Sequence, residues 1–263
     1  MRLIYILPIA ILIASCKSPT APKLIWSDEF DTPGNPDNTK WNYDLGDGCP
    51  NVCGWGNNEA EFYTQNLKNA RIENGMLIIE AHKDSLNGKA YTSSRMVSKF
   101  KGDWLYGRIE VKAKLPRGKG TWPAIWMLST DWKYGGWPAS GEIDIMEHVG
   151  YDPGVIHGTI HTESYNHVKQ TQKEGKITIA DAQDQFHVYG INWTKDTMEF
   201  FIDDTVYHSV VRDPKDTFKE WPFDQRFHLI LNIAVGGNWG GKEGIDDSIW
   251  PQRMTIDYVR VYQ

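Results

Sequence analysis

Three carboxylates lie within six residues of the segment GEIDIMEHVG: Glu142, Asp144 and Glu147. Side chains alternate between the two faces of a strand, so Glu142 and Asp144 share a face, whereas Glu147 falls at an odd offset and would point away. One extra residue, absorbed as a β-bulge at Ile145 and Met146, would return Glu147 to the face of the other two acids. We therefore predict a bulged strand that presents three carboxylates on one face.

Two carboxyl groups that face one site can cleave a glycosidic bond. One protonates the leaving oxygen and the other attacks the anomeric carbon, when the two are about 5–5.5 Å apart. Across the bulge Glu142 and Glu147 behave as residues four apart, roughly 13 Å between Cα atoms, and each side chain can lean along the strand toward the other. Because three neighbouring acids cannot all ionise easily, we expect repulsion to keep one protonated as the acid/base. The alternative is a group of ordinary surface charges.

Tryptophans gather around these acids. An indole beside polar groups is a stacking platform for the apolar face of a sugar ring, although core packing is the alternative for any single one. The tryptophans concerned are Trp122, Trp126, Trp132 and Trp137, just upstream of the acids, with Trp55 in WGNNEAEFYT and Trp239 in GGNWGG.

The rest of the sequence predicts strands. Short alternating runs rich in β-branched and aromatic residues, such as GRIEVKAKL, TMEFFIDD and RMTIDYVRVY, are separated by turn signals at the spacing typical of β-sandwiches. We predict one all-β domain from Leu24 to Gln263, with two packed antiparallel sheets and no helix beyond a turn or two near Ala180 to Gln185.

The composition fits this class and restricts the ligand. The chain has 263 residues with 12 Trp, 12 Tyr, 24 Gly and 13 Pro, as expected of a β-rich globular protein with many turns. Its formal net charge of −6 argues against nucleic acid as a partner and favours a neutral ligand.

Residues 1–16, MRLIYILPIAILIASC, have the pattern of an export signal: one Arg, an apolar run and small residues before Cys16. The apolar run is shorter than the roughly 20 residues that span a bilayer. The ending IASC resembles a bacterial lipobox, which implies a lipid on Cys16, a tether over residues 17–23 and a place in the cell envelope, at the outer membrane or cell surface. Ordinary cleavage without a lipid is the alternative.

The other two cysteines, Cys49 and Cys53, would form a disulfide in an oxidising compartment. A zinc site is the alternative for this CxxxC pair, but the sequence offers no matching second pair of ligands.

The acidic segment and its surroundings resemble glycoside hydrolase family 16, whose signature ExDxxE appears as EIDIME from Glu142 to Glu147. WGNNEAEFYT, GTWPAIWML, HGTIHT and IDYVRVY extend the resemblance over nearly the whole chain. It implies a β-jelly roll with a substrate cleft on its concave face. It also implies that Glu142 is the nucleophile, Glu147 the general acid/base and Asp144 a hydrogen-bond partner of the nucleophile, with no cofactor for catalysis.

The same resemblance implies further site residues. Sugar subsites are expected at Asn58, Arg95, Trp122, Trp126, Trp137 and His161, with Trp239 as another platform. A surface ion pair is the alternative for Arg95, and a satisfied polar residue or a metal ligand for His157 and His161. Family members often carry a structural calcium ion, which implies ligands here from the Glu29 and Gly75 carbonyls and the Asp257 side chain.

WPASGEID, HGTIHT and the extra residue Met146 resemble the laminarinase branch of the family, which implies a monomeric, retaining endo-β-glucanase. Its substrate would be β-1,3-glucan (laminarin), mixed-linkage β-1,3/1,4-glucan, or both. Agarases and carrageenases share the signature, but a sulfated galactan favours a more basic site. A non-catalytic, glucan-binding β-sandwich and a transglycosylase remain as further alternatives.

Overall fold

The computed structural model describes residues 22–263. The predicted signal peptide, Cys16 and most of the predicted tether lie outside these residues. In the part of the chain that is described, no helix is long and apolar enough to cross a membrane.

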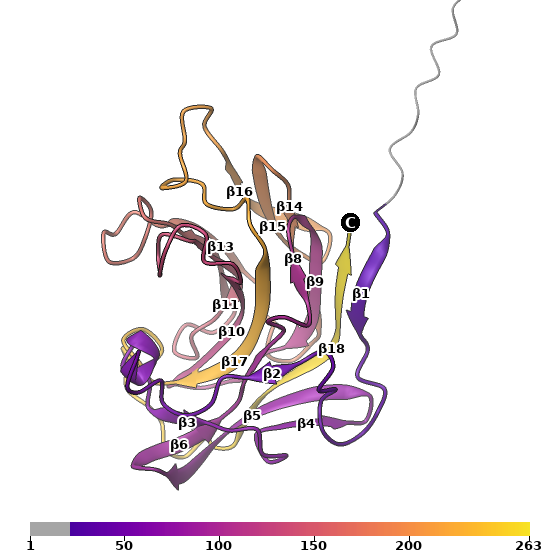
Figure 1. Cartoon of the computed structure of the whole chain (residues 1–263). Coiled ribbons are helices and arrows are strands. Elements are labelled where there is room, and N and C mark those ends of the chain that lie inside the picture. The colour runs from indigo at the N-terminus through magenta and orange to yellow at the C-terminus, as the bar shows by residue number, and fades with distance from the viewer. Residues whose placement is uncertain (1–21) are drawn as a thin grey trace, which may run out of the picture.

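The described chain forms two packed β-sheets (Figure 1). The outer sheet has ten strands, in the order β16-β15-β14-β9-β18-β5-β6-β3, with β1 added to β18 and β4 to β5. Their bounds are β1 Leu24–Asp28, β3 Glu61–Tyr63, β4 Ala70–Glu73, β5 Met76–Leu86, β6 Lys89–Ser93, β9 Gly107–Lys114, β14 His187–Trp193, β15 Thr197–Ile202, β16 Thr205–Val211 and β18 Gln252–Tyr262.

The inner sheet has eight strands, in the order β13-β12-β11-β10-β17-β7-β2, with β8 added to β17. Their bounds are β2 Asn42–Tyr43, β7 Arg95–Val97, β8 Asp103–Trp104, β10 Thr121–Ser129, β11 Glu142–Glu147, β12 Val155–His161, β13 Lys173–Thr178 and β17 Phe227–Val235. Figure 1 shows this sheet bending around one side of the molecule, so that the face turned away from the outer sheet is concave.

The core lies between the two sheets and follows the alternation of the strands. In β9 the residues Ile109, Val111 and Ala113 are fully buried, while the residues between them are partly exposed. Strand β17 is buried at all nine positions and lies inside the inner sheet, between β10 and β7.

The predicted all-β sandwich is confirmed, with two differences. The pair β3–β6 is parallel, whereas the other strand pairs of the described residues are antiparallel. The helical turn expected near Ala180 to Gln185 is a turn, closed by a hydrogen bond from the Gln185 amide to the Asp181 carbonyl. The helical segment of the described chain is instead η1 (Cys53–Gly56), a short 3-10 stretch in which Gly54 and Trp55 adopt positive φ angles.

Candidate active site

A β-bulge in β11 puts the three acids on one face. Between Asp144 and Glu147 strand β11 advances three residues while β12 advances two, so one residue of β11 is left over. The side chains of Ile145 and Met146, at the bulge, are both buried in the core. The pairs across to β12 are Glu142 with His161, Asp144 with Thr159 and Glu147 with His157. The bulge predicted at Ile145 and Met146 is thereby confirmed.

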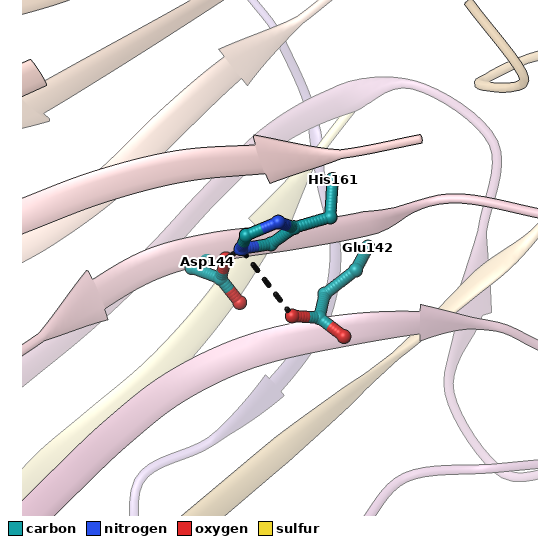
Figure 2. A group of neighbouring side chains, drawn as sticks. All are labelled: Glu142, Asp144 and His161. Atoms are coloured by element: carbon teal, nitrogen blue, oxygen red, sulfur yellow. Dashed lines mark ion pairs between the residues drawn. The ribbon is translucent and has the colours of Figure 1, made fainter. Parts of the chain in front are cut away.

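Each acid has a specific nitrogen neighbour. Trp137 Nε1 donates to Glu142 Oε2 at 2.8 Å, and Trp122 Nε1 donates to Glu147 Oε1 at 3.0 Å. His161 Nε2 lies 3.3 Å from Asp144 Oδ2 and 3.8 Å from Glu142 Oε1. Figure 2 shows these three side chains. Two of the predicted platform indoles therefore direct their N–H edges at the outer acids.

Burial raises the pKa of all three carboxyl groups. The pKa of Glu142 rises to about 8, through burial and then the charge of Asp144, against the opposing effects of His161 and the Trp137 N–H. Burial likewise raises the pKa of Asp144 to about 8. The pKa of Glu147 is raised well above its ordinary value, first by burial and then by the charges of Asp144 and Glu142. Our expectation that repulsion would single out one acid was incomplete, because burial is the larger cause and acts on all three.

Arg95 lies between two indoles on the other side of β11. Its guanidinium carbon is 4.3 Å from the ring centre of Trp55 and 4.8 Å from that of Trp126, and its Nε donates to Asp44 at 3.0 Å. The alternative for Arg95 was a surface ion pair. An ion pair is present, but the Arg95 side chain is only 8% exposed and also makes a double cation–π contact. One consequence is that a cation rather than open space lies beside Trp126.

A buried polar chain holds Trp126 from behind. Trp126 Nε1 donates to Asn232 Oδ1 at 2.7 Å, Asn232 Nδ2 donates to the Tyr63 hydroxyl at 3.0 Å, and that hydroxyl donates to Glu59 Oε2 at 3.1 Å. Sequence analysis missed Asn232 and Tyr63 as supporting residues. Glu59 and Tyr63 lie in the quoted segment WGNNEAEFYT, but Asn232 lies in an apolar strand and carries no local signal.

The loop that follows β17 brings Trp239 to the acids. The Trp239 ring packs edge-on against Trp122, with centroids 5.5 Å apart, and against His157, at 4.8 Å. Asn58 Nδ2 donates to Asn238 Oδ1 at 2.8 Å and ties this loop to the segment after η1. Trp239 therefore contacts the indole that binds Glu147, and Asn58 contacts its neighbour Asn238.

His157 and Glu174 form a pair that the sequence did not reveal. His157 Nδ1 lies 2.5 Å from Glu174 Oε1, and this hydrogen bond is the main reason that the pKa of Glu174 is lowered. His157 is a satisfied polar residue only in part. Its Nδ1 is paired with Glu174, whereas its buried Nε2 has no hydrogen-bond partner among the described residues. Glu174 lies in β13, and only strand register connects it to His157.

The remaining predicted residues lie away from the acids. Cys49 and Cys53 are joined by a disulfide. For the calcium site, β18 pairs with both β1 and β5. Glu29 after β1, Gly75 before β5 and Asp257 in β18 lie near the point where these two pairings meet, inside the outer sheet. Among the described residues neither the Glu29 nor the Gly75 carbonyl accepts a hydrogen bond, which suits a cation ligand, whereas the Asp257 carboxylate is paired with Lys112 Nζ at 2.8 Å.

The chain forms a curved β-sandwich, and one strand carries a pair of carboxylic acids that each accept a hydrogen bond from an indole. These features define a glycosidase of the two-carboxylate class. The chain belongs to glycosyl hydrolases family 16, whose family model matches residues 57–260. It is 49% identical over 261 residues to a beta-glucanase from Rhodothermus marinus, covering 96% of this chain and 90% of that protein. It is 41% identical over 253 residues to a glucan endo-1,3-beta-glucosidase from Cryptopygus antarcticus, covering 90% of each.

Solved structures agree with the fold. The X-ray structure of the laminarinase from Rhodothermus marinus superimposes with a TM-score of 0.88 at 49% sequence identity, covering 92% of this chain and 98% of that one. The fold expected from the resemblance, a family 16 jelly roll, is thereby confirmed.

Proposed function

We propose that the protein is a retaining endo-β-glucanase that hydrolyses β-1,3-glucan (laminarin), mixed-linkage β-1,3/1,4-glucan, or both. The observation that carries this proposal is the placement of Glu142 and Glu147 on one face, on either side of Asp144, through the bulge in β11. The beta-glucanase, endo-1,3-beta-glucosidase and laminarinase among the similar proteins support it.

Glu142 is the nucleophile in this proposal. It attacks the anomeric carbon and must be ionised to do so, which the positive potential of His161 and the Trp137 N–H both favour. The glycosyl–enzyme ester forms as the bond to the leaving oxygen breaks. Asp144 lies beside Glu142, and its negative charge opposes ionisation of Glu142, so an Asp144 that holds a proton helps to keep the nucleophile ionised.

Glu147 is the general acid/base. Burial and the neighbouring acids raise its pKa, which favours the protonated form that gives its proton to the leaving oxygen. It then takes a proton from the water that hydrolyses the ester. The N–H of Trp122 fixes Glu147 Oε1, which leaves Oε2 as the oxygen free for proton transfer.

The groups around the acids suit a neutral polysaccharide. Trp137, Trp122 and Trp239 are partly or largely exposed and offer apolar surface beside hydrogen-bonding groups, the combination that a glucose ring requires. The arginine that contacts the predicted platform Trp126, Arg95, is already paired with Asp44. A sulfated galactan would need free cations, so agarase or carrageenase activity is not favoured.

Two variants test the roles separately. Glu142→Ala should abolish release of reducing sugar from laminarin but still join an α-glycosyl fluoride donor to an acceptor sugar, because Glu147 remains as base. Glu147→Ala should keep the glycosylation step with activated aryl glycosides, which need no protonation. Reversed outcomes would exchange the two roles. A folded wild-type protein that binds laminarin and releases no sugar would identify a non-catalytic binder instead.

The N-terminal signal and the calcium site are further parts of the proposal. The ending IASC supports a signal peptide over residues 1–16 and lipidation at Cys16, which would place the enzyme in the bacterial cell envelope. The free carbonyls of Glu29 and Gly75 support a structural calcium ion, with Asp257 released from Lys112 to bind it. Calcium binding predicts that a chelator lowers the melting temperature and that added Ca²⁺ restores it.

A further inference from the structure

Three potential metal ligands converge at one end of the acidic strand. Glu142 and Asp144 in β11 and His161 in β12 each offer one ligand atom, and these three atoms lie within 4.8 Å of one another. Figure 2 shows the imidazole of His161 pointing toward the carboxyl groups of Glu142 and Asp144. The bulge follows Asp144, so this trio is held by the regular part of the strand pair.

The distances match a small tetrahedral ion. In a zinc site with metal–ligand bonds of about 2.0–2.1 Å, neighbouring ligand atoms are about 3.3 Å apart. His161 Nε2 is 3.3 Å from Asp144 Oδ2 and 3.8 Å from Glu142 Oε1. The first separation needs no adjustment, and the second needs a movement of about half an ångström. The third, between Glu142 and Asp144, lies within 4.8 Å, so Glu142 must also turn toward Asp144 by up to about 1.5 Å, which its side-chain torsions allow.

The three ligand atoms are directed at one another. Trp137 occupies Oε2 of Glu142 and leaves Oε1, the oxygen that faces His161. Asp144 Oδ2 has no hydrogen-bond partner within residues 22–263, although the Asp144 side chain is only 3% exposed. The ion pair with His161 Nε2 at 3.3 Å is the interaction that this buried oxygen makes, and a cation bound between the two groups would satisfy both.

We propose that Glu142, Asp144 and His161 form an inhibitory Zn²⁺ site, in which the ion takes one atom from each side chain and a water as fourth ligand. Imidazole with carboxylates suits zinc, whereas Ca²⁺ and Mg²⁺ prefer oxygen ligands alone. His161 Nδ1 has no hydrogen-bond partner among the described residues, and zinc-binding histidines normally have one. The affinity should therefore be about 10–100-fold weaker than that of a zinc site whose histidines have such partners.

The inhibition rests on the proposed function, because it follows from the role of Glu142 as nucleophile. A zinc ion on Glu142 Oε1 holds the electron pair that would attack the anomeric carbon. It also occupies the space that the sugar must enter. Zinc and substrate should therefore compete, and inhibition should be reversed by a chelator.

Calorimetric titration of the metal-free full chain with ZnCl₂ tests binding without any need for turnover. We expect one site, weakened at least about tenfold by His161→Gln and by Asp144→Asn. Co²⁺ as a probe should give the visible absorption of a four-coordinate ion, and this should disappear in the same variants. Glu174→Gln is the matched control. Glu174 is also an acid paired with a histidine of β12, His157, but neither residue belongs to the trio. It should change Zn²⁺ affinity by less than about twofold.

Two results would overturn the proposal. One is the absence of zinc binding in a protein that hydrolyses laminarin, which leaves the proposed function intact. The other is binding that survives His161→Gln but disappears in His187→Gln, since His187 lies between Asp181 and Asp203 on the surface and offers a competing site. Zinc binding by the predicted trio in a protein without hydrolase activity would support the site while refuting the proposed function.

Discussion

Deletion of Met146 would remove the extra residue of the bulge. The acids would then be spaced ExDxE, two apart throughout, and all three would stay on one face by simple alternation. The cost is the loss of a fully buried side chain, about 2–5 kcal/mol. For a domain of this size, this lowers the melting temperature by roughly 2–4 °C for each kcal/mol. Met146→Ala is the matched control, because it removes the same side chain and keeps the bulge.

The assay is reducing-sugar release from laminarin below the melting temperature of every variant. Met146→Ala should keep most of the wild-type rate, and the deletion should keep a measurable fraction of it, since the acids stay aligned but Glu147 is re-aimed. An alanine inserted after Ile143 should abolish activity, because it turns Glu142 away from the other two acids. An active insertion variant, or a folded deletion variant that is as inactive as the insertion variant, would refute the idea that the acids must share one face of the strand.

Three other predictions follow from the site and the N-terminal signal. Trp122→Phe removes the N–H that favours ionised Glu147, so the alkaline limb of kcat/KM against pH should move up by about one unit, and an unmoved limb would contradict the contact. Burial raises the pKa of Glu142 from 4.5 to about 8. The contribution of Glu142 to the free energy of unfolding is therefore fully present below pH 4.5 and is lost as the pH rises toward 8. Glu142→Gln should then be the more stable form at pH 8 by at least about 1 kcal/mol and equal to wild type at pH 4; denaturant titration at both pH values decides. Cys16→Ala should move the protein from the membrane fraction to the soluble fraction, because a lipid chain contributes about 0.8 kcal/mol for each buried CH₂; unchanged fractionation would exclude the anchor.

The bulge could be predicted from the sequence because it follows from parity alone. Three acids at offsets of two and three can share a face only if one residue is absorbed, and the apolar residues Ile145 and Met146 between them indicate where. The indoles could be predicted as neighbours of the acids because Trp122, Trp126 and Trp137 lie close to them in the chain.

The partners of these groups could not be predicted, because they depend on strand register. Glu174 meets His157 across the β12–β13 pair, and Asn232 meets Trp126 across β17 and β10. The direction of each indole N–H is likewise a result of packing. Trp137 and Trp122 were predicted as sugar platforms, and the structure shows in addition that they are hydrogen-bond donors to the two outer acids.

The two limbs of the pH profile should respond to different neighbours. Activity needs Glu142 ionised and Glu147 protonated, so the acidic limb follows the pKa of Glu142 and the alkaline limb that of Glu147. The charge of His161 lowers both pKa values, whereas the Trp122 N–H lowers that of Glu147. His161→Gln should therefore move both limbs to higher pH, by about one unit each, and shift the whole profile. Trp122→Phe should move the alkaline limb alone to higher pH, which broadens the pH profile. A His161→Gln profile that moves on the alkaline side only would show that His161 does not act on the nucleophile.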